Sequence, residues 1–541
     1  MKTFVNLSFG LLLSAYIGCV AFGQAPAATL PQTPAGKAFA DPNLDKYNNA
    51  VYDFNQATQA YNTAKNSGQP LDPANAKIAT TITELKEASL LPAYQKDTVK
   101  QATLHNLLGY LYLTQGDTAN AVTELQTTVQ DDPGNLDAHN NLGNALRGSS
   151  PPDYAGAAVQ YEYILAHPAA PGGHSSLDIN KVKFNLATVE GQAGRMDESL
   201  ALFQELTASD PSAAVYKNYG FFLQKAGKSA EAADALQKAA QISPKDAEVW
   251  FNSGQLYAKS GNQNQAIAAL TKAVGPDVDP KLDVKNEYDA YFALGEAYAA
   301  NSDPNQAMKE FLTASQLQPL NAVPLYNMGV LQEQAGLRAD AQTSYRSALK
   351  LDPNNAQIQM ALGLLLADSG NSAEAAALLA QVAPKLPQNS KAAPVYARLG
   401  DVYARQHNYS DSNKARLQAL TLNSADTDTR LALGDSYMAQ KQYVSALVQY
   451  DIAAAAKPND AAIQNQRGVA YKNLKQYPKA LAAFKRALAL SPRNAQVQNN
   501  IGVLDELLGR RAEAIVAYKK ALALNPGLTV ARMNLVRFSH P

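Results

Sequence analysis

An asparagine recurs two residues before a regularly placed glycine along most of the 541-residue chain. An amide both donates and accepts hydrogen bonds, so a row of amides at one structural position could bind the backbone of an extended peptide without reading its side chains. We therefore predict a peptide-binding role for the set Asn141, Asn185, Asn218, Asn252, Asn327 and Asn500, which Asn534 matches near the C-terminus.

A second set of groups that could bind a ligand is acidic. Asp401 and Asp435 each follow such a glycine directly in successive units, and Glu296 holds the same position earlier in the chain. Carboxylates in register would favour a basic segment of a ligand. The alternative is a pair of solvated carboxylates that bind nothing.

No constellation that would support catalysis is found in the sequence. The six histidines include no pair with a metal-ligand spacing within a helix, and there is no glycine-rich phosphate loop. His105 and His139 stand four residues before successive glycines, where Trp250 and Tyr291 stand elsewhere, which indicates a packing position. We expect no enzyme activity, no cofactor and no metal.

The elements that must position these residues follow a period of about 34 residues, the step from Gly109 to Gly143. In most units a glycine and a later proline keep one fixed spacing, and Ala or Ser always stands midway between them. Ala187 replaces the glycine once, which gives twelve units. The reference glycines are Gly109, Gly143, Gly220, Gly254, Gly295, Gly329, Gly363, Gly400, Gly434, Gly468 and Gly502.

This spacing predicts two short helices in each unit. Gly329 lies on the first helix of its unit and Ala341 on the second, and their small size lets the helices approach closely. Gly336 follows the first helix, where a left-handed residue ends it, and Pro353 stops the second helix. Each unit is therefore expected to be a helix, a tight turn, a second helix and another turn.

The pattern resembles the tetratricopeptide repeat, whose family features include these small residues and the closing proline, over residues 98–527. The resemblance implies an all-α fold, a right-handed α-solenoid of about 12 repeats with helical caps, in which the first helices line a concave inner surface. One repeat cannot bury its own apolar face, so neighbouring repeats stabilise one another. A long binding surface is expected rather than a single pocket.

On this geometry the asparagines form a ladder along the inner face. The ladder is similar to that of the O-linked N-acetylglucosamine transferases, whose catalytic part has no counterpart here. Asparagine is also common at this position in family members without a known peptide ligand. Some family members bind acidic chaperone tails with a clamp that pairs a Lys three residues before the glycine with an Asn one residue after it. Here Lys217 is matched with Phe221, so this clamp is missing. Phe292 and Tyr326 are expected to anchor a ligand.

Three longer steps interrupt the period, at 167–176, 275–283 and 384–394. We expect loops or extended helix ends there, either as tolerated surface insertions or as local partner contacts. Residues 43–97 are predicted to form a diverged helical pair that caps the N-terminal end, and residues 528–541 a C-terminal capping helix.

The N-terminus has the pattern of a secretory signal peptide, predicted over residues 1–23, in which Lys2 precedes an apolar core and small residues. Cleavage before Gln24 is expected. Lipidation of Cys19, the only cysteine, is an alternative that would make a membrane-anchored lipoprotein, and an uncleaved anchor is another. Residues 24–42 are a linker rich in Pro and Ala.

The whole-chain charge bears on the choice of partner. The 47 basic and 47 acidic side chains give a net charge of zero, so no nucleic-acid partner is expected, and a membrane is expected as a partner only if Cys19 is lipidated. We expect a periplasmic or secreted scaffold or adaptor of a bacterial envelope that binds extended protein segments in the groove. The alternatives are an accessory subunit for a separate glycosyltransferase or polysaccharide-export system, and an outer-membrane or cell-wall assembly factor.

Overall fold

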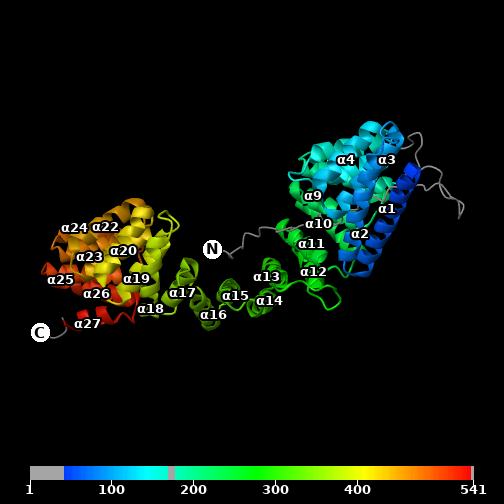
Figure 1. Cartoon of the computed structure of the whole chain (residues 1–541). Helices are drawn as coiled ribbons and strands as arrows, with labels where there is room; N and C mark the ends of the chain where they lie inside the picture. The colour runs from blue at the N-terminus through cyan, green and yellow to red at the C-terminus, as the bar shows by residue number, and fades with distance from the viewer. Residues whose placement is uncertain (1–41, 168–176, 538–541) are drawn as a thin grey trace. The chain divides into compact units, whose positions relative to one another are not determined.

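The computed structural model describes residues 42–167 and 177–537, which form α-helices and one 3-10 helix, with no strand in these two ranges (Figure 1). The all-helical prediction is confirmed. The predicted signal peptide with Cys19, almost all of the linker, and most of the insertion at 167–176 lie outside the described residues. In the described ranges, no helix is long and apolar enough to cross a membrane.

Contacts between helices divide the chain into two compact units, residues 42–310 and residues 311–537 of the described chain. The first unit contains α1 (Pro42–Ser67), α2 (Asp72–Ser89), α3 (Thr98–Gln115), α4 (Thr118–Asp131), α5 (Leu136–Gly148), α6 (Tyr154–Ala166), α7 (Ile179–Gln192), α8 (Met196–Ser209), α9 (Ala213–Lys225), α10 (Ser229–Ile242), α11 (Ala247–Lys259), α12 (Gln263–Ala273) and α13 (Val284–Ala300). Helix α14 (Pro304–Leu317) contains the border. The second unit contains α15 (Val323–Gln334), α16 (Arg338–Leu351), α17 (Ala356–Asp368), α18 (Ser372–Val382), η1 (Ala383–Lys385), α19 (Ala393–Arg405), α20 (Tyr409–Leu422), α21 (Thr427–Ala439), α22 (Tyr443–Ala456), α23 (Ala461–Asn473), α24 (Tyr477–Leu490), α25 (Ala495–Leu507), α26 (Arg511–Leu524) and α27 (Thr529–Arg537).

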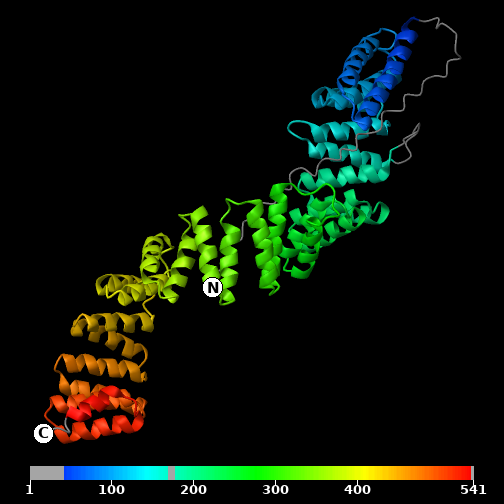
Figure 2. The same ribbon diagram turned by 90° about the horizontal axis from the view of Figure 1, so that it is seen from below.

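Helices α3 to α26 make twelve repeats, numbered one to twelve, each beginning with the first helix that carries the reference position. First and second helices pack on each other, as α3 does on α4 and α25 on α26. Figure 2 shows the helices from α19 onward (yellow to red) stacked pair upon pair. Helices α1 and α2 pack together ahead of repeat one, with α2 on α3, and α27 packs on α26 after repeat twelve.

The reference glycine has the packing role that its spacing predicts. A Cβ added at Gly329 would lie 2.6 Å from ring carbons of Tyr345 on the second helix, and one at Gly434 would lie 2.4 Å from the Tyr450 ring. A larger residue would therefore push the two helices of the repeat apart. Where serine takes the small position on the second helix, its hydroxyl is satisfied, because Ser412 Oγ donates to the carbonyl of Gly400 at 2.7 Å.

The turn between the two helices uses left-handed backbone, as predicted. Gly336 has a φ of 76°, and the N–H of the next residue, Leu337, donates to the carbonyl of Gln332 at 2.8 Å, which closes the helix end. His407, Lys441 and Lys475 take the same left-handed conformation with φ values of 58° to 60°. These three helix ends therefore carry backbone strain that glycine would relieve.

The residue four before the reference position ties the first helix to the preceding turn. Trp250 Nε1 donates to the carbonyl of Pro244 at 3.0 Å, and His139 Nε2 lies 3.0 Å from the carbonyl oxygen of Pro133. His139 and Trp250 are both buried. These contacts support the packing role predicted for this position.

The insertions are part of the packed structure where they are described. In 275–283, Val278 is buried and the N–H of Asp279 donates to the carbonyl of Lys245 at 2.9 Å, which holds the segment on the turn between α10 and α11. In 384–394, the end of η1 and a turn lead into α19.

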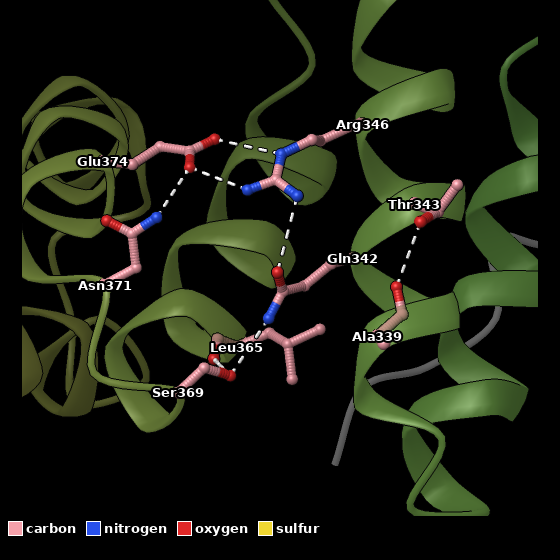
Figure 3. A network of polar contacts seen from close by, with 8 residues as sticks. All are labelled: Ala339, Gln342, Thr343, Arg346, Leu365, Ser369, Asn371 and Glu374. Atoms are coloured by element: carbon pink, nitrogen blue, oxygen red, sulfur yellow. Dashed lines mark hydrogen bonds and ion pairs between the residues drawn. The ribbon is translucent and has the colours of Figure 1, made fainter.

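Second helices of neighbouring repeats are joined by polar contacts between α16 and α18 (Figure 3). Arg346 donates through Nη2 and Nε to the two carboxylate oxygens of Glu374, at 2.8 and 3.2 Å. Asn371 Nδ2 also donates to Glu374, at 3.0 Å, and Gln342 Nε2 donates to Ser369 Oγ at 3.1 Å. The charge of Arg346 is therefore matched within the protein.

Candidate functional site: the seam between first helices

The first helices of neighbouring repeats contact one another. Such contacts join α3 with α5, α7 with α9 and α11 with α13 in the first unit, and α17 with α19, α19 with α21, α23 with α25 and α25 with α27 in the second. Successive second helices in the described ranges do not approach one another to the same extent. First helices therefore line the concave side within each unit, and we call their row of mutual contacts the seam.

Most of the predicted asparagine ladder is buried in the seam. Asn141, Asn185 and Asn327 expose at most 2% of their surface and Asn252 exposes 9%, whereas Asn218 and Asn500 are partly exposed. Of the ladder asparagines, a ligand on the concave side could therefore reach Asn218, Asn500 and the matching Asn534 without movement of the helices.

The expected aromatic anchors are also buried. Phe292 exposes 0% and Tyr326 exposes 4% of its surface. The prediction that these two rings anchor a ligand is therefore wrong, because both belong to the packed interior.

Several ladder amides bond to the first helix of the preceding repeat. Asn500 Nδ2 donates to Asn465 Oδ1 at 2.8 Å, and Asn534 Nδ2 donates to Asn499 Oδ1 at 3.1 Å. In each of these pairs the partners are 35 residues apart. We call such a bond between first helices an amide rung. The same position thus links one repeat to the next.

Two other bonding patterns occur in the first unit. Asn185 Nδ2 donates to Asn144 Oδ1 at 3.5 Å, and Asn185 Oδ1 accepts from Arg147 Nη1 at 3.4 Å. Asn218 Nδ2 instead donates to the carbonyl of Ala214 in its own helix, at 3.0 Å. The partly exposed Asn218 therefore keeps its amide oxygen for another donor.

Two members of the ladder are buried with no hydrogen bond to the side chain. Within residues 42–167 and 177–537, neither Nδ2 nor Oδ1 of Asn141 or Asn327 has a partner, and Asn106 Oδ1 also lacks one. Asn106 precedes Asn141 by the same separation in sequence that the amide rungs of the second unit have. An unsatisfied buried amide costs about 1–3 kcal/mol, so these sites are weak points of the seam.

The predicted acidic site is internally paired at Asp401. Its carboxylate accepts from Arg416 Nη2 at 2.9 Å and lies 3.9 Å from Arg398 Nη1. Arg398 also pairs with Asp368, and Arg416 donates through Nη1 to the carbonyl of Ala432 at 2.9 Å. Arg416 is buried at a position that holds Tyr, Phe or Leu in the other repeats.

The carboxylate of Asp435 is paired by neutral donors. Tyr450 Oη donates to it at 2.5 Å and Gln466 Nε2 at 2.8 Å. Burial raises the pKa of Asp435 above its ordinary value, and the bond from Tyr450 opposes that rise. Both predicted acidic residues thus have protein partners, and their role toward a basic ligand stays a prediction.

Glu296 holds the same position in the first unit but is poorly paired. Its Oε1 is buried and has no hydrogen-bond partner among the residues that the structure describes. Burial raises the pKa of Glu296 to about 7. The side chain is therefore divided between its neutral and charged forms near neutral pH.

The C-terminal end of the chain carries an excess of basic side chains, which the neutral net charge of the whole chain does not show. Residues 467–537 contain thirteen Lys or Arg and three Asp or Glu, although the whole chain is neutral. A charge count taken repeat by repeat would have found it. By contrast, the described part of the chain contains no group of three or more His, Cys, Asp or Glu side chains that could hold a metal ion.

Profiles of the tetratricopeptide repeat match most of the repeat region. They match residues 106–174, 184–247, 223–283, 288–319, 326–390, 461–494 and 495–527. Together these segments cover more than half of the chain.

Individual relatives match at low identity. Human protein O-mannosyl-transferase TMTC3 is 21% identical over 312 residues, 56% of this chain and 34% of the relative. Cellulose synthase operon protein C of Escherichia coli is 24% identical over 204 residues, 35% of this chain and 17% of the relative. Matches to the first curated relatives thus span about a third of their length or less.

A solved structure shows the same kind of similarity. The crystal structure of a tetratricopeptide repeat protein from Parabacteroides merdae is 19% identical, with a TM-score of 0.32, and covers 47% of this chain and 99% of that chain. Three observations indicate the same repeat: the matches to the family profiles, the regular spacing of the glycines, and the pairing of the helices. The chain belongs to the tetratricopeptide repeat family and is a protein-interaction scaffold.

Proposed function

We propose that this scaffold binds extended segments of partner proteins along the concave side of its first helices, and that it does so outside the cytoplasm of a bacterial cell. The observation that carries the proposal is the row of first helices, on which Asn218 and Asn500 keep partly exposed amides. Affinity would come from many weak contacts spread along the row.

The test begins with capture of partners by the full chain from its own cell extract, followed by mass spectrometry. A captured partner is then titrated by calorimetry against Asn218→Ala and Asn500→Ala. We expect each change to weaken binding about 3- to 10-fold, the value of one or two hydrogen bonds, without loss of helicity. Asn120→Ala is the matched control, because Asn120 is exposed on the second helix α4. Equal affinity of all three variants and the unaltered protein would remove the ladder from the proposal.

Export is the part of this proposal that the leader sequence supports. Intact-mass measurement of the chain from its native cells tests it. A mass that begins at Gln24 supports a released protein, a lipid adduct on Cys19 supports an anchored one, and an unprocessed N-terminus contradicts both.

A second candidate function is an accessory role in glycan transfer or polysaccharide export. The similarities to an O-mannosyl-transferase and to a cellulose synthase operon protein favour it. In this role the first helices would present protein substrates to a separate transferase. Co-purification with a glycosyltransferase would support this candidate, and partners limited to wall or outer-membrane assembly proteins would favour an assembly factor.

A further inference from the structure

The excess of basic side chains is concentrated in repeats eleven and twelve and in α27. Lys485 and Arg486 on α24 are followed one repeat later by Lys519 and Lys520 on α26, in the same register. All four side chains are exposed. In the ten preceding repeats, no other pair of adjacent basic residues holds this register.

These side chains lie on the outer side of second helices. The exposed positions of α26 include Ala512, Val516, Lys519 and Ala523, whose spacing of three to four residues places them on one helix face. The concave side is lined by first helices. The basic pairs therefore lie on the convex side of the second unit.

In the part of the chain that the structure describes, Arg486 Nη2 donates to Asn459 Oδ1 at 2.9 Å, and the three lysines have no ion pair. Arg346 holds the register of Lys485 in repeat seven, where Glu374 of the next repeat neutralises it (Figure 3). Glu513 holds the position of Glu374 opposite Lys485, but no ion pair joins these two described residues. Lys519 and Lys520 likewise have no ion pair or hydrogen bond in the part of the chain that the structure describes.

Exposed aliphatic side chains lie among the basic ones. Val516 is 50% exposed one turn before Lys519 and Lys520, and Leu524 is 39% exposed one turn after Lys520. The adjacent rings, Phe484 and Tyr518, are fully buried. The surface thus combines lysine, arginine and aliphatic groups and has no ring at these positions on which a nucleic-acid base could stack.

We propose that the convex face formed by Lys485, Arg486, Val516, Lys519 and Lys520 docks the protein on an anionic phospholipid bilayer. A convex face fits an extended planar surface better than a peptide, which needs a groove. Clusters of basic residues bind anionic bilayers through their headgroups, and exposed aliphatic side chains beside them enter the interface. This mode of association is independent of Cys19.

The experiment measures sedimentation of the full chain with vesicles of mixed phosphatidylglycerol and phosphatidylcholine, and with vesicles of phosphatidylcholine alone. Each basic residue near such a surface contributes about fivefold to the partition constant, so Lys519→Gln with Lys520→Gln should weaken binding to the anionic vesicles about 25-fold. Raised salt should weaken binding of the unaltered protein. Lys385→Gln with Lys391→Gln is the control, because it removes two exposed charges from the same unit outside repeats eleven and twelve.

Three results would overturn the proposal. Equal binding to both kinds of vesicle would show that charge is not responsible, and equal losses in the two double variants would show that this face is not special. Absence of vesicle binding together with salt-sensitive binding of a short DNA duplex, lost in Lys519→Gln with Lys520→Gln, would assign the face to nucleic acid instead. Unchanged circular dichroism of both double variants would show that neither set of substitutions alters the fold.

Discussion

The seam between first helices is built differently in the two units. In the first unit, Asn106 and Asn141 are buried with side-chain atoms that have no partner in the described residues, and the partly exposed Glu296 has one buried carboxylate oxygen without such a partner. In the second unit, polar side chains bond across one step after another, in the amide rungs of Asn500 and Asn534 and in the bond from Gln466 to Asp435. Asn327 and Ser436 are among the exceptions on its first helices, because each has a buried side-chain atom with no hydrogen-bond partner in the described residues.

The difference shows that a residue type at a fixed register does not have a fixed role. Asn141 and Asn500 hold the same position of their repeats, yet one is an unsatisfied group and the other a link between repeats. Each of them follows another asparagine by 35 residues, Asn106 and Asn465, so the type of the facing residue does not decide whether the bond forms. An asparagine ladder read from sequence is therefore a set of separate local environments.

The largest expected effect is at Arg416, which lies on the second helix α20 and bonds to the first helices on both sides, α19 and α21. Arg416→Ala removes a buried guanidinium and leaves Asp401 and the carbonyl of Ala432 without their donor, which should destabilise the second unit by about 3 kcal/mol. Hydrogen exchange of α19 to α21 measures it. Arg416→Leu should cost less, because Leu379 fills this position in repeat eight. A loss of less than about 1 kcal/mol in Arg416→Ala, the size expected for the partly exposed Arg398→Ala, would contradict the assigned role.

The next largest effect is the dependence of the free energy of unfolding of the first unit on pH, through Glu296. Because burial raises the pKa of Glu296 to about 7, the folded state binds its proton more tightly than the unfolded state. The free energy of unfolding should therefore fall as the pH rises from about 4.5 to above 7, and Glu296→Gln should remove this fall and stabilise the unit by about 2 kcal/mol at pH 8. Fluorescence of Trp250, the single tryptophan, follows the unfolding of this unit.

Asp435→Asn is the matched variant in the second unit. Asp435→Asn should stabilise its unit less at alkaline pH than Glu296→Gln stabilises the first unit, because the ionised carboxylate of Asp435 accepts hydrogen bonds from Tyr450 and Gln466. Identical pH profiles for Glu296→Gln and the unaltered protein would show that Glu296 is solvated in solution.

Replacing an unbonded asparagine and replacing one that forms an amide rung should change the free energy of unfolding in opposite directions. Asn141→Leu replaces an unsatisfied buried amide by an apolar group of similar size and should stabilise the first unit by about 1–2 kcal/mol. Asn500→Leu removes an amide rung and should destabilise the second unit by about 1 kcal/mol. Urea unfolding, followed by Trp250 for the first unit and by hydrogen exchange for the second, compares them. Destabilisation by Asn141→Leu would mean that water bonds the amide.

The smallest effect concerns helix ends that use left-handed residues other than glycine. Lys441 and Lys475, both in the second unit, have φ values of 60°. Lys441→Gly and Lys475→Gly should each stabilise that unit by about 0.5–1 kcal/mol, because glycine adopts this conformation without strain. Gly336→Ala should destabilise it by a similar amount. Thermal unfolding measures the stability of all three variants. A loss of stability in both Lys→Gly variants would show that the left-handed backbone at Lys441 and Lys475 is not strained.

The sequence by itself determined the repeat. Gly329, Ala341, Gly336 and Pro353 act within a single unit of two helices, where contacts between residues close in sequence decide the structure. Their spacing therefore predicted the paired helices, the close approach at the glycine and the left-handed turn. The uneven charge of repeats eleven and twelve was also readable, but only by counting repeat by repeat.

Only the tertiary structure decided which side chains are free. The burial of Asn141, the pairing of Asp401 with Arg416 and the burial of Phe292 depend on how one repeat stacks on the next. A repeating position fixes the direction in which a side chain leaves its helix, but its exposure depends on the distance to the neighbouring first helix and on the residue found there. That distance is set by the summed packing of two repeats, which no single position encodes.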